Sequence, residues 1–378
     1  MVASAATFFF WASLYLYVPI LPVFAESLGA SLSSVGIVVA SYAVPQLLFR
    51  IPIGVAADRL GSRKCLVVAG LAATTGGAAL MGFSENTWTL LAGRTATGVG
   101  AAGWVAVSVL FLSFRRPDET GKAIGTANFI TGAALVASTG AGGAVAEIWG
   151  LRAAFFGAAV LGGIGLLLAI WVVEPETGRA RDPSWAAFRR IATDPLLLTV
   201  AFMSLLTNFS SFAGVFGFIP IYADRIGASS AVLGLITMIS QGAGAVASLV
   251  AGRAAARWGD RTIIRVGAVL ASLSMVVVPS VKSVALLAVT LAVNGIGNGA
   301  LATMFMSLAV RRAVPEQRAT AMGVYQALYA IGMLLGPLAS GYLASAVSIA
   351  GVFYLIAALM AVPVALAWLI PANVRESA

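Results

Sequence analysis

Twelve long apolar runs constrain what this chain of 378 residues can fold into. Each run has roughly the 17–25 residues that an α-helix needs to cross the hydrocarbon core of a bilayer. Strands of a membrane barrel alternate apolar and polar residues, whereas 160–173 is apolar at nearly every position. The sequence therefore predicts an all-α membrane protein with twelve transmembrane helices. The runs lie at about 3–24, 33–56, 65–83, 88–113, 121–147, 153–173, 196–222, 231–255, 262–280, 284–310, 319–347 and 350–370.

The charged residues are few and unevenly placed. They make up 10% of the chain, against about 25% in soluble domains. Of the 23 Lys and Arg residues, 18 fall in the loops after the even-numbered runs and in the C-terminal tail. Basic residues gather on the cytoplasmic side of membrane proteins. We therefore expect a multi-pass protein of the cell membrane with both termini in the cytoplasm. The net charge of +9 then reflects topology, and no nucleic-acid partner is expected.

Two residue types that often carry chemistry are scarce. Cys65 is the single cysteine, and the chain has no histidine. A disulfide within the chain, a histidine metal site and a histidine proton relay are therefore excluded. No clustered catalytic groups are visible, so we expect neither an enzyme nor a cofactor. The first apolar run begins without a basic leader, and we interpret it as a transmembrane helix instead of a signal peptide.

The chain repeats itself at an offset of 198 residues. Matching residues in 22–36, 54–63 and 117–125 recur in 220–234, 252–261 and 315–323. The repeat predicts an N-terminal six-helix half (1–175), a cytoplasmic linker (176–194) and a C-terminal six-helix half (195–378). Many transporters are built from such repeats and hold substrate near the midplane between them. The linker residues 185–190 fit either a short amphipathic helix on the inner membrane face or a solvated connection.

A charged loop joins the second and third runs. It reads Gly-Val-Ala-Ala-Asp-Arg-Leu-Gly-Ser-Arg-Lys over 54–64 and resembles the G-x-x-x-D-R-x-G-x-R-K signature of the major facilitator superfamily. The resemblance implies the fold of that superfamily, two pseudo-symmetric six-helix bundles, with this loop latching the halves together on the cytoplasmic side. Arg50 and Gln46 lie on the same i, i+4 stripe as Asp58, which favours a gate role for Arg50 over a substrate contact. The signature residues are Gly54, Asp58, Arg59, Gly61, Arg63 and Lys64.

A single arginine interrupts the fourth run. Arg94 opens the sequence Arg-Thr-Ala-Thr-Gly-Val-Gly, which resembles the R-x-x-x-G-x-G pattern of the same superfamily. An arginine inside a membrane helix costs at least about 2.5–3.5 kcal/mol and is a functional candidate by default. Glu26, at similar depth, is the predicted partner, and the pair would respond to protons or to an anionic group. The alternative is an arginine that only extends outward from the helix end.

Polar and aromatic residues near the middle of several runs are candidates for the transport cavity. In the superfamily the first, fourth, seventh and tenth helices line this cavity, with contributions from the second, fifth, eighth and eleventh. Hydrogen bonds between helices are an equally good explanation for any one amide. No Asp or Glu lies near the middle of a run, which favours neutral or amphipathic solutes. The candidates are Tyr15, Tyr42, Gln46, Trp104, Asn128, Asn208, Gln241, Asn294, Asn298, Tyr325, Gln326 and Tyr329.

The resemblance implies a secondary transporter that works by alternating access. We expect proton-coupled efflux of an amphipathic or drug-like small molecule, by a monomer in the lipid bilayer. The alternative is uptake or exchange of a small metabolite or organic anion, including uniport. The fifth run reads Ser-Thr-Gly-Ala-Gly-Gly over 138–143 and lacks the Gly-Pro pair of the antiporter branch, whereas the eleventh run has one at 336–337.

Overall fold

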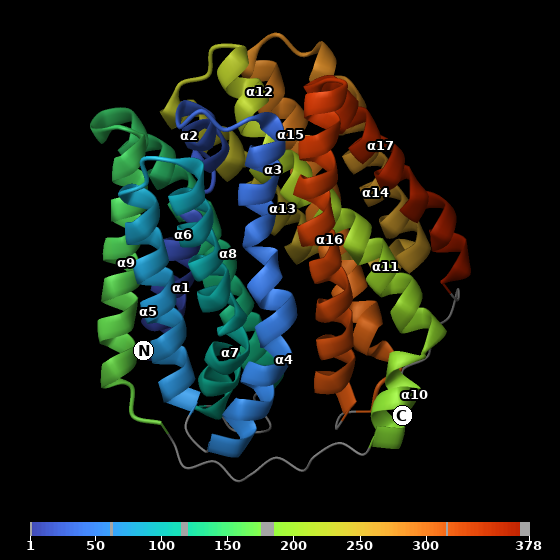
Figure 1. The fold of residues 1–378 in the computed structure, drawn as a ribbon. Coiled ribbons are helices and arrows are strands. Elements are labelled where there is room, and N and C mark those ends of the chain that lie inside the picture. The colour runs from blue at the N-terminus through green and yellow to red at the C-terminus, as the bar shows by residue number, and fades with distance from the viewer. Residues whose placement is uncertain (1, 61–62, 115–119, 175–184, 315–316, 371–378) are drawn as a thin grey trace. The chain divides into compact units, whose positions relative to one another are not determined.

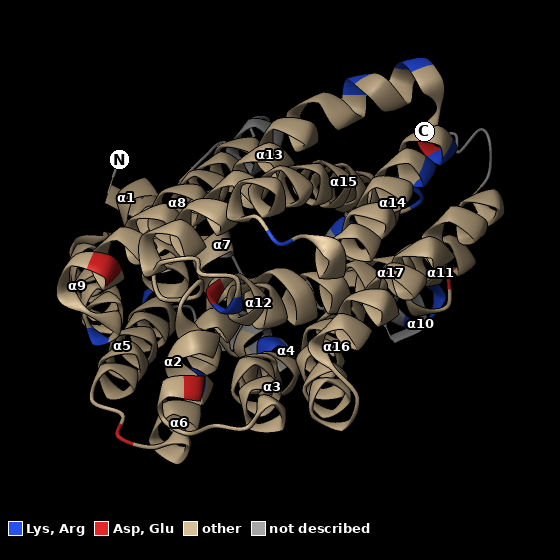
Figure 2. Cartoon of the chain, turned by 90° about the horizontal axis from the view of Figure 1, so that it is seen from above, with Lys and Arg blue, Asp and Glu red and all other residues tan. Residues whose placement is uncertain are grey.

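The protein is helical throughout the part of the chain that the structure describes. The computed structural model describes residues 2–60, 63–114, 120–174, 185–314 and 317–370. Within these ranges every regular element is a helix, and ten helical segments are long and apolar enough to cross a membrane. Figure 2 shows how few charged positions the helices carry. The prediction of an all-α membrane protein is confirmed.

Three of the twelve predicted spans are divided into shorter helices: the run at 33–56, which becomes α3 (Leu32–Ser41) and α4 (Ala43–Leu60), and two further runs. The run at 3–24 becomes α1 (Val2–Tyr15) and α2 (Leu21–Ser27), which are separated by a turn at 16–20. The run at 88–113 becomes α6 (Thr87–Ala102) and α7 (Trp104–Ser113). Apolar composition continues across these interruptions, so the hydropathy pattern located these spans but not the breaks within them.

The chain forms two compact units, and the first comprises Met1–Ala180 together with Gly227–Met238. Its helices, in chain order and with those already given, are α1, α2, α3 (Leu32–Ser41), α4 (Ala43–Leu60), α5 (Arg63–Gly82), α6, α7, α8 (Thr120–Trp149) and α9 (Leu151–Trp171) (Figure 1). Helix α5 packs against α6 and α9, and α1 packs against α8 and α9. Glycines allow this close packing: a Cβ on Gly77 of α5 would lie 2.7 Å from the carbonyl oxygen of Gly93 in α6.

The second unit comprises Arg181–Ile226 and Ile239–Ala378. Helix α11 packs against α16, and α14 packs against both α15 and α17. A helix does form at the predicted amphipathic segment, as α10. The elements of this unit are α10 (Trp185–Ala192), α11 (Pro195–Ser210), a π-helix (Ser211–Phe218), α12 (Ile219–Arg225), most of α13 (Ser230–Trp258), α14 (Asp260–Val277), a 3₁₀ turn (Val278–Ser280), α15 (Val284–Arg311), α16 (Arg318–Ala346), α17 (Ile349–Leu366) and a 3₁₀ turn (Ala367–Leu369).

The structure divides the chain differently from the sequence at the start of α13. The repeat assigned all of 195–378 to the C-terminal half, yet Gly227–Met238 belongs to the first unit. A Cβ on Gly143 of α8 would lie 2.7 Å from the Cα of Gly234. Glu147, near the end of α8, also accepts a hydrogen bond on Oε2 from the backbone N–H of Ala231, at 3.2 Å. These contacts hold the first turns of α13 against α8.

The first predicted span of each half has irregular backbone at the same place in the repeat. The turn at 16–20 corresponds, 198 residues on, to 214–218 inside the π-helix Ser211–Phe218. A proline follows each irregular segment: Pro22 in the first turn of α2 and Pro220 in the first turn of α12. Proline has no amide hydrogen, so regular α-helical bonding stops before it. Local π-helical backbone is frequent at functional sites.

Candidate functional site

Arg94 of α6 lies buried in the first unit with a shell of tyrosines. Its side chain is 2% exposed. The Nη1 atom donates a 2.7 Å hydrogen bond to the hydroxyl of Tyr17. The guanidinium carbon lies 4.2 Å from the ring centroid of Tyr42 and 5.4 Å from that of Tyr17. Cation–π attraction of this kind contributes about 0.5–2 kcal/mol, so the aromatic rings partly replace the water that the cation lost.

The local backbone explains why these tyrosines reach Arg94. Tyr17 lies in the turn between α1 and α2, and its hydroxyl donates to Thr97 Oγ1 at 3.2 Å. Thr97 in turn donates to the carbonyl oxygen of Arg94 at 2.7 Å. Tyr42 lies at the junction of α3 and α4, and a Cβ on Gly98 would lie 2.5 Å from its carbonyl oxygen. The glycine of the R-x-x-x-G-x-G pattern therefore permits the approach that brings the Tyr42 ring onto Arg94.

The predicted ion pair between Glu26 and Arg94 is not formed in this structure. Among the described residues, the contacts of Arg94 are with Tyr17 and Tyr42, and its Nε finds no hydrogen-bond partner. Glu26 lies in the last turn of α2 and makes other contacts. In the described state the turn at 16–20 presents Tyr17 to Arg94 Nη1, and the pairing of Arg94 with Glu26 stays a prediction.

The predicted gate loop is described only in part. Gly61 lies outside the described part of the chain, as do the side chains of Asp58 and Arg59 and the surroundings of Gly54. At Arg63 and Lys64 the structure shows a feature that the sequence did not predict. Their backbone N–H groups donate to Oε1 and Oε2 of Glu174 at 2.8 and 3.1 Å.

This capping carboxylate comes from the segment that follows α9. A carboxylate at a helix N-terminus satisfies free N–H groups and complements the helix dipole. Glu174 therefore fixes the start of α5 at the last two residues of the predicted latch, Arg63 and Lys64. Its place at the end of an apolar run, just before the linker, was the one signal in the sequence.

The predicted i, i+4 stripe is formed between Gln46 and Arg50. Arg50 Nη2 donates to Gln46 Oε1 at 3.0 Å, and Gln46 Nε2 donates to the carbonyl oxygen of Tyr42 at 3.1 Å. The chain of bonds thus runs from Arg50 toward the residue that covers Arg94. The gate role of Arg50 stays a prediction because the side chain of Asp58 is not described.

The other cavity candidates of the first unit are aromatic or exposed. Trp104 at the start of α7 lies with its ring centroid 5.0 Å from that of Trp11, and Tyr15 lies 5.9 Å from Trp11 on the other side. Asn128 of α8 is exposed. The structure thus joins Tyr15 and Trp104 through Trp11, which the sequence analysis did not single out, and it leaves Asn128 outside this cluster.

In the second unit, Tyr325 of α16 shares a hydrogen bond with Ser204 of α11, which also accepts one from Asn208. Its hydroxyl shares a 2.8 Å hydrogen bond with Ser204 Oγ, and its ring lies 5.5 Å from that of Tyr329. Asn208 Nδ2 donates to the carbonyl oxygen of Ser204 at 2.9 Å. Gln241 and Gln326 are both partly exposed. Tyr325, Tyr329 and Asn208 therefore form one polar and aromatic group between α11 and α16.

Asn294 and Asn298 lie one turn apart on α15 and form a chain of hydrogen bonds. Asn298 Nδ2 donates to Asn294 Oδ1 at 2.8 Å. Asn294 Nδ2 donates to Ser274 Oγ of α14 at 2.9 Å, and Ser274 donates to the carbonyl oxygen of Ala271 at 2.8 Å. Asn294 is fully buried, whereas Asn298 is partly exposed. The helix-to-helix explanation holds for Asn294, while the Oδ1 of Asn298 has no partner among the described residues.

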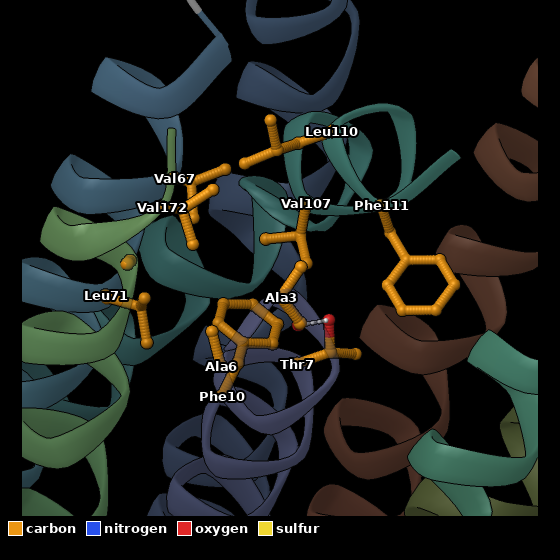
Figure 3. A pocket seen from close by; sticks show the side chains of 11 residues that line it. Ala3, Ala6, Thr7, Phe10, Val67, Leu71, Val107, Leu110, Phe111 and Val172 are labelled. Atoms are coloured by element: carbon orange, nitrogen blue, oxygen red, sulfur yellow. Dashed lines mark hydrogen bonds between the residues drawn. The ribbon is translucent and has the colours of Figure 1, made fainter. Parts of the chain in front are cut away.

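A small pocket lies among α1, α5, α7 and α9, away from the predicted residues. Figure 3 shows its apolar lining, with the Thr7 hydroxyl turned back onto the carbonyl oxygen of Ala3. The pocket offers about 20 Å³ to a water-sized solute, against roughly 300–1,000 Å³ for a site that holds a drug-sized molecule. It is a packing gap inside the first unit, and none of the predicted site residues lines it.

Comparison with known proteins identifies the family. The model of the Major Facilitator Superfamily matches residues 3–231 and 202–378, which together span nearly the whole chain. This chain belongs to the Major Facilitator Superfamily. The superfamily that the 54–64 loop predicted is thereby confirmed, and this superfamily member is a membrane transporter and not an enzyme.

Two curated relatives and one solved structure illustrate the match. The transporter is 30% identical over 194 residues to the inner membrane transport protein YajR of Escherichia coli, covering 50% of this chain and 42% of YajR. It is 25% identical over 370 residues to the multi-drug resistance efflux pump PmrA of Streptococcus pneumoniae, covering 93% of this chain and 91% of PmrA. A bacterial homologue of the human lysosomal transporter Spinster matches in structure with a TM-score of 0.80 and 17% identity, covering 97% and 96% of the two chains.

Proposed function

We propose that this transporter exports amphipathic, drug-like small molecules by alternating access, driven by the proton gradient. The observation that carries the proposal is the burial of Arg94 against Tyr17 and Tyr42 without an ion pair among the described residues. A buried cation without a carboxylate is costly, and such residues in membrane helices mark functional sites. The near full-length similarity to an efflux pump supports export as the direction of transport.

Arg94 offers a means of energy coupling in two states. In the described state the Tyr17 hydroxyl and the Tyr42 ring hold the guanidinium. In a second state the deprotonated carboxylate of Glu26 would pair with Arg94, and protonation of Glu26 would return Arg94 to the tyrosines. The coupling role of both residues therefore rests on an exchange of partners and not on a permanent ion pair.

Efflux from the cell requires a defined orientation. We propose a monomer in the cell membrane with both termini in the cytoplasm, as the positive-inside distribution favours. The Gly54–Lys64 loop and Arg50 would then form the cytoplasmic latch, and Glu174 would anchor that latch to the end of α9. Reporter domains fused to each terminus, active on only one side of the membrane, test this topology.

The decisive experiment uses purified protein in liposomes with an imposed pH gradient and ethidium as the transported dye. We expect the gradient to increase the initial rate of dye transport several-fold in the wild type. Glu26→Gln should transport the dye at one rate with or without the gradient, because this carboxyl can no longer exchange a proton. Glu85→Gln, at an exposed carboxylate in the loop after α5, is the matched control, because it removes the same charge elsewhere. Wild-type transport that ignores the gradient would rule out proton coupling.

Transport of an organic anion is the second candidate. It is favoured by one observation, the buried Nε of Arg94 that lacks a hydrogen-bond partner among the described residues. A carboxylate or phosphate on the solute could accept from that atom. Counterflow of a labelled dicarboxylate that is lost in Arg94→Ala, together with no transport of ethidium, would favour this function over efflux of amphipathic molecules.

A further inference from the structure

The hydrogen bonds through Asn298, Asn294 and Ser274 have a fixed direction. The chain ends on the carbonyl oxygen of Ala271, which can only accept. Ser274 must therefore donate to it, and Ser274 Oγ is left to accept from Asn294 Nδ2. This places Asn294 Oδ1 toward Asn298, which must then offer its Nδ2. The backbone thus determines which end of each amide points where.

The open end of this chain is consequently a hydrogen-bond acceptor. Asn298 Oδ1 is enclosed and has no partner among the described residues. A buried polar atom without a hydrogen bond costs about 1–3 kcal/mol, and such atoms in native proteins call for an explanation. Turning the Asn298 amide over would not remove the cost, because two carbonyl oxygens would then face each other at Asn294. The position needs a donor from outside the chain of bonds.

The position of Asn298 favours a transported solute as that donor. Asn294 is fully buried and Asn298 is partly exposed, so Asn298 is the end of the chain of bonds that lies nearer to the surface of the second unit. Gly98 packs on Tyr42 as Gly295 packs on Ser240, so the offset within this helix is 197 and the residues of the first half that correspond to Asn294 and Asn298 are Thr97 and Ala101. The first half therefore cannot offer the same group, and the acceptor is a property of α15.

We propose that Asn298 Oδ1 accepts a hydrogen bond from an N–H or O–H group of the transported solute and makes the transporter prefer solutes that carry such a donor. The proposal rests on the proposed function, since it names the kind of amphipathic molecule that is exported. Asn294 and Ser274 act as positioning residues that hold the acceptor oxygen in place. Because this oxygen is enclosed in the described state, the proposal requires that it becomes accessible in another state of the transport cycle.

Two dyes that differ only in their donors test the proposal. Rhodamine 123 has unsubstituted amino nitrogens, and tetramethylrhodamine methyl ester has the same skeleton with those nitrogens fully methylated. Binding of each dye to purified protein in detergent is measured by fluorescence anisotropy for the wild type, Asn298→Ala and Asn298→Leu. The control is Ser272→Ala, which removes a 2.8 Å hydrogen bond from α14 to Ala357 in the same unit.

We expect Asn298→Ala and Asn298→Leu to weaken rhodamine 123 binding about tenfold and to change binding of the methylated dye less than twofold. Ser272→Ala should leave the ratio of the two affinities unchanged. Equal effects on both dyes would mean that a water or a structural role satisfies Asn298, and this would overturn the proposal. No effect on either dye, or no rhodamine 123 binding by the wild type, would also overturn it. Dye discrimination without gradient-driven transport would contradict the proposed function alone.

Discussion

Helices α6 and α15 occupy the same place in the two halves but carry different chemistry. In α6 a buried arginine is held by tyrosines, and the helix ends at Ala102, with α7 beginning at Trp104. In α15 the helix continues over 28 residues, and the apolar Leu291 stands at the position that corresponds to Arg94. Its polar groups are the neutral amides of Asn294 and Asn298. The two helices keep the same place in their halves, but α6 carries a buried charge and α15 carries neutral amides.

This difference indicates a division of work between the halves. A cation responds to charged partners over several ångströms, including a carboxylate that gains or loses a proton, whereas an amide recognises only a group in direct hydrogen-bond contact. The first half would therefore respond to the gradient and the second half would select the solute. Changing each helix separately tests this division.

The largest effect is expected from Arg94→Ala. Gradient-driven transport should fall by about a hundredfold, or ~2.7 kcal/mol in the transition-state free energy, while dye affinity stays within a factor of about three. Tyr17 would still donate to Thr97, so the fold should persist. Initial rates in liposomes with and without a pH gradient measure the change. A loss of dye affinity as large as the loss of rate would show that the first half also selects the solute, which contradicts the proposed division between the halves.

A smaller effect, on stability, is expected from Gly98→Ala in α6. The new Cβ would meet the carbonyl oxygen of Tyr42 at 2.5 Å, and overpacking of this kind costs about 1–3 kcal/mol. The Tyr42 ring should also move off Arg94, so transport should fall together with the melting temperature in detergent. Gly76→Ala in α5 is the matched control, because nothing lies within 4 Å of its Cβ position. Equal melting temperatures for the two variants would contradict the packing argument.

The smallest effects are expected at the N-termini of α5 and α14, the third predicted span of each half. In α5, Glu174→Gln should weaken the cap on Arg63 and Lys64 and lower stability by about 1 kcal/mol. In α14, Asp260 instead pairs with Arg311 near the surface, and Asp260→Asn should cost about 0–1 kcal/mol. Thermal unfolding of both variants in detergent measures this order. A larger loss for Asp260→Asn would show that the ion pair, and not the cap, is the stronger anchor.

The sequence predicted most of the fold because the signals involved are local or repeated. Apolar runs of bilayer length indicate helices wherever they occur, and an offset of 198 residues was legible without any contact. The bond between Arg50 and Gln46 was predictable because i, i+4 spacing on a helix determines it. Arg94 was identified as a functional candidate from its cost in a membrane helix alone.

Tertiary structure alone decided what these residues contact. The partner of Arg94 is Tyr17, 77 positions away, because the turn at 16–20 directs that hydroxyl inward. Glu174 caps a helix that starts 111 positions earlier. The orientation of the Asn298 amide is determined by the carbonyl oxygen of Ala271 on another helix. Hydropathy does not record the direction of a side chain or a hydrogen bond. These directions are determined by packing between distant segments, where the glycines let the helices approach.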